Sequence, residues 1–369
     1  MTPVAMTGLG MVTTVGHDLV TAYGALRCGM VRPWPVDFEV PADAGNANTL
    51  LTAHPLRGIT DGFQGLGRYL RMGLHAVDDL VHQAGLVREP ARFWQGAALY
   101  VALSRTRNQE IDFYDGILQE ELPRRIAAHA GLAIPEDRRY ALFRGHASAL
   151  WALREASLAI EQGRIERALI LGVDSLLESD TLAFLAATRR LKTNVRPRGL
   201  IPGEAAAAFL LEPTRAARAR QASIRCTVEA SEVGQEKESR VSGGRSAGTA
   251  LSEVIRKLLS SERPLRAIYG DLNGEDSRAD EWGHARVRLS ESHELSGAAQ
   301  HWLAVSLGDT GAASGAVALA VGAQALWRRH VSEGDILVWS SADTGEVAAA
   351  RLREAEPPVP FPALRGGRR

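Results

Sequence analysis

Residues 145–177 read GHASALWALREASLAIEQGRIERALILGVDSLL, and this stretch decides the fold. A turn of small residues leads directly into an apolar helix, and a buried strand follows the glycine that ends the helix. Enzymes often place a nucleophile at such a turn, because the free N–H groups at a helix start stabilise negative charge. The residue at this turn is His146. Either His146 is itself a catalytic group, or it stands where a catalytic group would be expected.

The same alternation of strands and helices continues on both sides of this stretch. Before Pro213, apolar strands are predicted over 4–16, 96–104, 167–175 and 205–213. After Pro213 the pattern starts again, with strands predicted over 223–234, 265–274 and 335–343. Strands that alternate with helices predict a mostly parallel sheet covered by helices. The restart predicts an internal duplication, with one half over 1–215 and the other over 216–369.

Three other segments carry weaker patterns. Residues 31–64 are rich in Pro, Gly, Asn and Asp and have no clear period, which predicts a loop. Residues 110–132 have helical spacing interrupted by Pro123, which predicts a pair of helices. Residues 302–329 predict a strand, a glycine-rich turn and a buried helix of small residues, which lets neighbouring elements approach closely. Residues 335–343 are predicted to form the last strand.

Composition and charge are those of a soluble globular protein. Lys and Arg together number 43, as do Asp and Glu, so the formal charge of the 369-residue chain is zero. That balance argues against a general nucleic-acid binder, which would be basic. No run approaches the ~18 apolar residues of a membrane span, and the N-terminus lacks the basic segment of a signal peptide. We therefore expect a cytoplasmic protein without a membrane span.

Neither cysteines nor glycine motifs predict a cofactor. Cys28 and Cys226 lie far apart and form no CxxC pattern, so they indicate neither a disulfide framework nor a metal site. The GLG at 8–10 lacks the further glycine of a nucleotide-binding loop, and there is no P-loop lysine pattern. The sequence therefore predicts no cofactor, and a reducing compartment fits the free thiols.

Four stretches, taken together, resemble the β-ketoacyl synthases of the thiolase fold. Residues 4–31 look like the family's first strand, turn and helix, and residues 145–177 look like its nucleophile turn, buried helix and following strand. Residues 196–213 are similar to its RPFD…GEG region, and residues 305–326 to its K-S-x-x-G-H-T…GAAG motif. The stretches occur in the family's order and span most of the chain. The resemblance implies a thiolase-like α/β fold of two duplicated halves, layered α-β-α-β-α.

The family condenses an acyl thioester with a malonyl thioester, using a nucleophilic Cys, two His and a nearby Lys. On the matched motifs, His146 stands at the position of the Cys, Asp309 at the second His and Ala304 at the Lys. The first His would fall within YGDLNGEDSRADEW, at Asp271 or Leu272. The resemblance thus makes His146, Asp309 and Asp271 the candidate site residues, and it implies that every catalytic position has changed.

These changes lead to two hypotheses about function. The first is a catalytically degenerate β-ketoacyl synthase-like protein that acts as a non-catalytic partner or stabilising subunit, either like a chain-length factor or as an accessory to a secretion or biosynthetic gene cluster. The second is an acyl-thioester enzyme of the 3-oxoacyl synthase class with altered chemistry, an acyltransferase, hydrolase or decarboxylase that uses His146. The missing nucleophile favours the first, as does the replacement of the family's GFGGTN turn by SADTGE at 341–346.

The family's architecture also implies partners. The run GAALYVALS at 96–104 is continuously apolar, as expected of a strand buried on both faces. In the family that strand pairs across a twofold axis, so we expect a homodimer, or a heterodimer with a synthase homologue, formed through residues 97–104. An acyl carrier protein or another protein is a further partner that the resemblance implies.

The duplicated fold implies that the turns carrying His146 and Asp309 face one another, so we expect their side chains within hydrogen-bond or ion-pair distance. In one interpretation they form a dyad in which His146 is a general base. In the other they form a polar pair that fills and closes the old acyl site. A helix N-terminus favours a carboxylate over an imidazolium. We therefore expect His146 to donate to an ionised Asp309 that also accepts backbone N–H bonds.

Residues 271–287, DLNGEDSRADEWGHARV, form a cluster of charges. The charged and titratable residues are Asp271, Glu275, Asp276, Arg278, Asp280, Glu281, His284 and Arg286. Carboxylates and a histidine can ligate a metal, but the spacing fits no defined site. The pattern favours a solvated loop with internal ion pairs.

Overall fold

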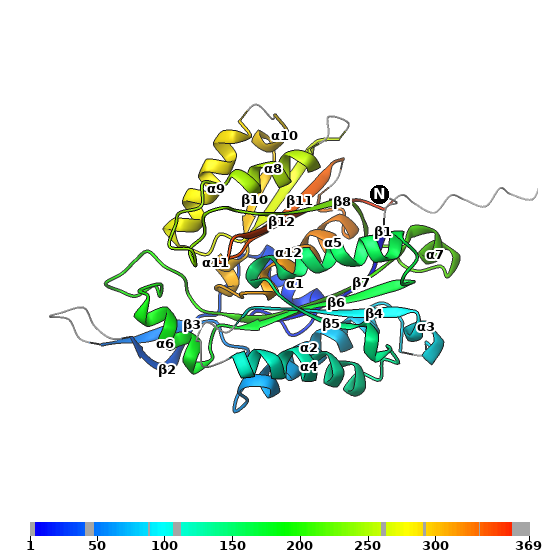
Figure 1. Ribbon diagram of the computed structural model, residues 1–369, viewed down its shortest axis with the longest axis horizontal. Coiled ribbons are helices and arrows are strands. Elements are labelled where there is room, and N and C mark those ends of the chain that lie inside the picture. The colour runs from blue at the N-terminus through cyan, green and yellow to red at the C-terminus, as the bar shows by residue number, and fades with distance from the viewer. Residues whose placement is uncertain are drawn as a thin grey trace, which may run out of the picture.

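The computed structural model describes residues 4–40, 48–87, 89–105, 112–259, 263–290, 293–331 and 333–355. Helices and sheets alternate in layers across the molecule, in the order α-β-α-β-α (Figure 1). The outer helices on one side are α2 (Gly65–Gln83) and α4 (Asp112–His129), and on the other side α8 (Thr249–Leu258) and α9 (Asp276–Arg288). Between the two halves of the main sheet lie α5 (Ser148–Glu161) and α12 (Ala313–Trp327). This layering confirms the predicted fold class.

The two halves repeat one strand order. The first half contains β1 (Val4–Thr13), β4 (Ala97–Leu103), β5 (Arg139–Phe143), β6 (Arg167–Ser175) and β7 (Glu204–Pro213), ordered β5-β4-β6-β7-β1. The second contains β8 (Cys226–Gln235), β9 (Leu265–Gly270), β10 (Ala299–Trp302), β11 (Asp335–Ser341) and β12 (Glu346–Arg353), ordered β10-β9-β11-β12-β8. If the strands of each half are numbered one to five along the chain, their order across the sheet is three, two, four, five, one in both halves. The repeat supports a division of the chain near residue 215, which stays a prediction.

Strand directions repeat as well. In each half the fifth strand, β7 or β12, is antiparallel to both of its neighbours, and the other neighbouring strands are paired in parallel. The mostly parallel arrangement therefore comes with one reversed strand in each half. A short antiparallel contact between β1 and β8, over Val4–Met6 and 226–228, joins the halves into one ten-stranded sheet.

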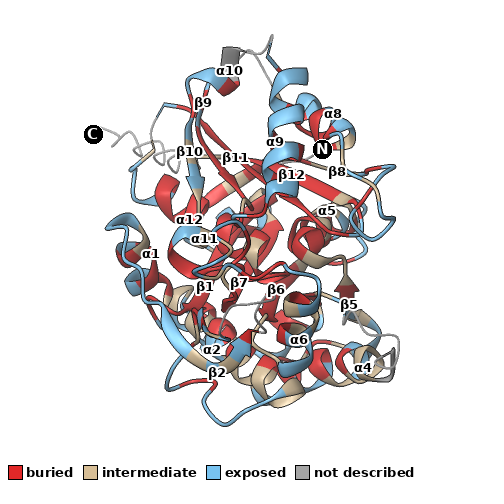
Figure 2. Cartoon of the chain, turned by 90° about the vertical axis from the view of Figure 1, so that its left-hand side faces the viewer, coloured by how far each residue is buried: buried red, intermediate tan, exposed pale blue. Residues whose placement is uncertain are grey.

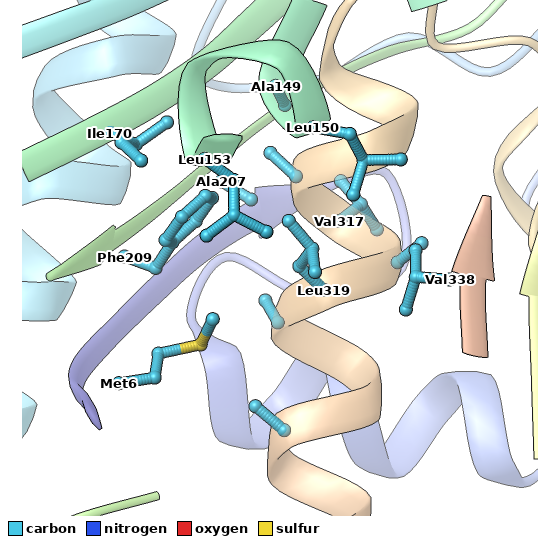
Figure 3. Close-up of a cluster of buried hydrophobic side chains, with 14 of the residues drawn as sticks. Met6, Ala149, Leu150, Leu153, Ile170, Ala207, Phe209, Val317, Leu319 and Val338 are labelled. Atoms are coloured by element: carbon cyan, nitrogen blue, oxygen red, sulfur yellow. The ribbon is translucent and has the colours of Figure 1, made fainter. Parts of the chain in front are cut away.

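Small residues bring both halves of the main sheet close to the central helix α12. Figure 3 shows Leu150 and Leu153 of α5, Val317 and Leu319 of α12 and Phe209 of β7 in one buried cluster. Nearly all of α12 is buried, and it lies in the buried centre of Figure 2. Because α12 and the facing strand β7 are rich in small residues, helix and sheet approach closely.

Two segments differ from their predictions. Residues 31–64 contain an antiparallel pair, β2 (Trp34–Val40) and β3 (Thr49–Ala53), and are not simply a loop. Val36, Phe38 and Val40 alternate along β2 and pack in a cluster with α6 (Ser179–Ala187), so a period of two was present over 34–40 and was overlooked. Residues 112–129 form the single helix α4, which continues through Pro123. Packing of its apolar residues against the core offsets the hydrogen bond that Pro123 cannot make.

The end of the chain also differs from its prediction. Residues 303–307 are not a strand, because β10 ends at Trp302 and a short helix, α11 (Ala304–Leu307), follows. The strand β11 is not the last, since β12 follows it and pairs with both β11 and β8. Among the helices of the described ranges, none is long and apolar enough to cross a membrane.

The prediction that residues 97–104 pair across a twofold axis is wrong. β4 is hydrogen-bonded in parallel to β5 on one side and to β6 on the other, so neither of its edges is open. The open edge of this half of the sheet is β5. A continuous apolar run correctly indicated burial on both faces, but it does not distinguish a central strand from its neighbours.

Gly10 in β1 sets the distance between the sheet and α2. A Cβ at residue 10 would lie 2.0 Å from the Ala76 carbonyl oxygen and 2.4 Å from the Leu80 nitrogen. We therefore expect Gly10→Ala to lower the free energy of unfolding by about 1–3 kcal/mol, because backbone must move. Gly24→Ala in α1 (Leu19–Arg27) is the matched control, since its Cβ would meet nothing within 4 Å. Urea denaturation that finds the two variants equally stable would refute this packing.

Candidate functional site

The two turns at the starts of α5 and α12 meet at the interface of the halves. His146 lies in a short turn ahead of α5, and Asp309 follows Gly308, whose φ of 70° favours glycine, ahead of α12. Both side chains are buried. His146 Nε2 lies 2.6 Å from Asp309 Oδ1, so the expected contact is present.

The Asp309 carboxylate is surrounded by donors. Oδ1 also accepts the Gly311 N–H at 2.9 Å, and Oδ2 accepts a bond from Asn273 Nδ2 at 2.6 Å. Burial alone would raise the pKa of Asp309, but His146, Arg278 and Asn273 outweigh it and hold the pKa well below its usual range. Asp309 is therefore ionised, and the expected backbone N–H bond is present.

Arg278 occupies the other nitrogen of the histidine ring. Its Nη2 lies 3.0 Å from His146 Nδ1. A guanidinium can only donate, so Nδ1 must accept and the ring proton must be on Nε2, from which it is donated to Asp309. In this arrangement His146 is a neutral imidazole with a hydrogen bond at each nitrogen.

Arg278 also connects Asp271 to the site. Its Nη1 donates to Asp271 Oδ2 at 3.2 Å and to the Ser341 carbonyl, and Nη2 donates to Asp343 Oδ1 at 3.4 Å. Burial raises the pKa of Asp271, although Arg278 and the hydrogen bond from the Ser341 N–H oppose the rise. Of the three predicted residues, His146 and Asp309 are in direct contact, and Asp271 reaches His146 through Arg278. The alternative position, Leu272, is part of the outer apolar cluster.

A second buried arginine extends the network. Arg190 donates from Nε and Nη2 to both oxygens of Glu275, at 2.7 and 2.6 Å, and from Nη1 to Asp343 at 2.7 Å. Although burial raises the pKa of Glu275, Arg190 outweighs it and lowers the pKa overall. Arg240 approaches Glu275 at 3.0 Å from a more exposed position.

The interpretation of residues 271–287 as a solvated loop is wrong. Most of this segment is the helix α9, and Glu275, Arg278 and Glu281 are buried. Its carboxylates are bonded mainly to arginines, and in the described part of the chain no group of three His, Cys, Asp or Glu is arranged to hold a metal. The charges of this segment are visible in the sequence, but Arg278, Asn273 and Arg190 were not predicted to be site residues. Their partners His146, Asp309 and Glu275 are distant from them in the chain.

A cavity of about 620 Å³ opens beside the His146–Asp309 pair. The apolar side chains that line it are Leu66, Leu118, Leu176, Phe184, Leu185 and Leu200. Its polar lining includes Tyr69, Asp174 and Glu178. The expectation that His146 and Asp309 close the old acyl site is therefore wrong. His146 and Asp309 are hydrogen-bonded to each other in the cavity wall, and the cavity beside them is open.

Asp309→Asn is expected to lower the free energy of unfolding by about 1–3 kcal/mol at pH 7, since His146 and Asn273 then lose an ionised acceptor. The folded-state pKa of Asp309 lies below its ordinary value. The stability that its charge supplies is therefore present above the unfolded pKa of about 3.9 and is lost as the pH falls further. Urea titrations of wild type and variant should converge at acid pH, whereas a deficit equal at pH 3 and pH 7 would contradict this assignment.

Comparisons with known proteins identify the fold. No family model and no curated protein matches the chain. An oxazolomycin ketosynthase domain of Streptomyces albus JA3453 is 19% identical with a TM-score of 0.76, covering 98% of this chain and 76% of that one. The module 6 ketosynthase of the bacillaene synthase of Bacillus subtilis 168 is 15% identical with a TM-score of 0.75, covering 96% and 72%. A type II polyketide ketosynthase solved with its acyl-carrier protein is 14% identical with a TM-score of 0.77, covering 96% and 99%. The chain therefore has the ketosynthase fold of the thiolase-like proteins.

Proposed function

We propose that the protein is a catalytically inactive ketosynthase-like subunit that acts through a partner protein. The observation that carries this proposal is the pair of hydrogen bonds on His146, from Arg278 to Nδ1 and from Nε2 to Asp309. A general base needs a free lone pair within reach of the substrate proton. Here the lone pair on Nδ1 is directed to a guanidinium that is buried and always charged.

No cysteine replaces the missing nucleophile. Cys28 is exposed at the end of α1, and Cys226 is buried in β8, where burial raises its pKa far above the usual range. Neither lines the cavity beside His146. Cys226 is buried and neutral, and Cys28, although exposed, does not line the cavity, so neither thiol can carry an acyl group there.

A second candidate function is an acyl-thioester enzyme with altered chemistry. The retained cavity favours it, because a volume of about 620 Å³ beside His146 is large enough to hold a small substrate. Against it stands Arg278, which must release His146 before the ring can take a proton. A variant that frees Nδ1, Arg278→Met, would raise thioester turnover if this candidate were correct and would leave it at background if the protein is inactive.

We infer that the partner is a second copy of the chain or a synthase homologue, paired along the open edge of β5. Tyr140 of β5 is 40% exposed and its ring lies 5.0 Å from that of Tyr100. A solved relative in fold is a polyketide ketosynthase in complex with its acyl-carrier protein. On the basis of that complex, we propose that this chain has a role in polyketide or fatty acid biosynthesis and that an acyl-carrier protein is a further partner.

Light scattering tests the pairing. We expect a dimer mass for the chain alone or after mixing with a synthase homologue, and we expect Tyr140→Glu to reduce it to a monomer, since a charge at the edge opposes strand pairing. Val287→Glu, at a 72%-exposed position of α9, is the matched control and should leave the mass unchanged. A monomer mass at every concentration, with or without a homologue, would rule out the proposed assembly.

A further inference from the structure

The cavity beside His146 has an acidic lining with little positive charge available to a ligand. The carboxylates that line it belong to Asp174, Glu178, Asp180 and Asp309, and the cations to Arg105 and Arg190. Arg190 uses Nε, Nη1 and Nη2 on Glu275 and Asp343. Arg105 is exposed. An anionic ligand in this cavity would therefore be repelled by the carboxylates, and the buried Arg190 would not be available to bind it.

Asp174 is the buried carboxylate of this lining whose charge lacks a cation. It lies near the end of β6 and is 2% exposed. Oδ1 accepts the Tyr69 hydroxyl at 3.0 Å and the Ser175 N–H at 2.9 Å, and Oδ2 accepts the Ala312 N–H at 2.7 Å. Within the described ranges Asp174 forms no ion pair with a Lys, Arg or His, whereas the neighbouring Asp309 does. A buried carboxylate without a cation is costly, and a bound cation would lower that cost.

Three acceptor groups of the lining are close together around Asp174. The hydroxyls of Tyr69 and Ser104 both donate to the carboxylate, and all three residues line the cavity. A hydroxyl that donates still has lone pairs with which to accept. An ammonium carries three donors and no acceptor, so two of its N–H groups can donate to the Tyr69 and Ser104 hydroxyl oxygens, which places its charge next to the Asp174 carboxylate. Apolar residues of α2, α4 and α6 also line the cavity.

We propose that this cavity binds a small amphipathic cation, with an ammonium head at Asp174 and an apolar body between α2, α4 and α6. The volume of about 620 Å³ is within the range of small-molecule sites. Such binding is independent of whether His146 performs chemistry. It predicts a higher affinity for an amine than for a neutral or acidic molecule of the same length.

Isothermal titration with octylamine, 1-octanol and octanoate at pH 7 tests the proposal, since the three probes share a chain and differ in head charge. We expect octylamine to bind on the order of 10-fold more tightly than octanol, as for a charged hydrogen bond, and octanoate to bind most weakly. Asp174→Asn should remove the preference for the amine and keep octanol binding. Asp78→Asn, at a side chain 74% exposed on α2, removes the same charge and should change nothing.

A second variant locates the site independently of Asp174. Leu66→Trp places a larger side chain in the cavity lining and should weaken binding of all three probes. Equal affinity of wild type for octylamine and octanol, tighter binding of octanoate, or undiminished amine binding by Leu66→Trp would each overturn the proposal. The comparison of the three probes on wild type decides the question even if Asp174→Asn does not fold.

Discussion

Acyl and malonyl carrier thioesters are expected to give no condensation product with this protein. Removal of an activated nucleophile or its base typically costs on the order of 10⁴–10⁶ in rate. Here His146 stands where the resemblance places the nucleophile, and its two ring nitrogens are bonded to Arg278 and Asp309. Neither cysteine lines the cavity. Product formation should therefore equal that of a sample without protein.

The matched variant is His146→Ala, which removes the ring and should leave the background rate unchanged. An active ketosynthase assayed with the same carrier proteins shows that the thioesters are competent. Steady turnover by the wild-type chain that His146→Ala abolishes would show that the imidazole performs chemistry, and the non-catalytic proposal would then be wrong.

Arg278→Met is expected to have the largest effect on stability, lowering the free energy of unfolding by about 3–5 kcal/mol, as when one partner of a buried ion pair is removed. Arg278 is buried and donates to Asp271, Asp343 and His146. Its loss leaves the buried Asp271 without its ion pair. Burial already raises the pKa of Asp271, so the deficit should grow above the ordinary pKa of about 3.9 and shrink as the pH falls toward it.

Arg198→Met is the control for Arg278→Met. Arg198 pairs with Asp276 at 3.3 Å, but its side chain is 79% exposed. An exposed ion pair is worth about 0–1 kcal/mol, so its loss should hardly change the urea midpoint. Equal midpoints for the two variants would mean that the buried network contributes no more than a surface pair.

The predictable part of the site came from the resemblance to the β-ketoacyl synthases, which matched His146 and Asp309 to facing positions. Each of the two residues lies in a turn that leads into a helix of small and apolar residues. The duplicated halves that the resemblance implied bring two such turns to one interface, so their contact was expected. The strands β1, β4, β6 and β7 were equally visible, because each is a short apolar run.

The remainder of the site could not be predicted because it depends on contacts between distant segments. Arg190 and Glu275 are 85 residues apart, and Arg190 and Asp343 are 153 apart. A charged residue can be buried when it has a partner of opposite charge. The sequence does not show which charged residues have such a partner, so a buried charge cannot be distinguished from a solvated one. The same reason explains why residues 271–287 were interpreted as a loop, although much of α9 packs against α8 and the second sheet.

The hydrogen bonds to Arg278 and Asp309 leave His146 without a lone pair free for catalysis. Nitrogen NMR of protein labelled at the histidine rings measures this, with His146→Ala used to assign the signal. At neutral pH we predict a neutral ring with the proton on Nε2 and with Nδ1 as a hydrogen-bond acceptor, and we predict that Arg278→Met shifts the Nδ1 signal. A proton on Nδ1, or an Nδ1 signal that Arg278→Met leaves unchanged, would contradict the claim.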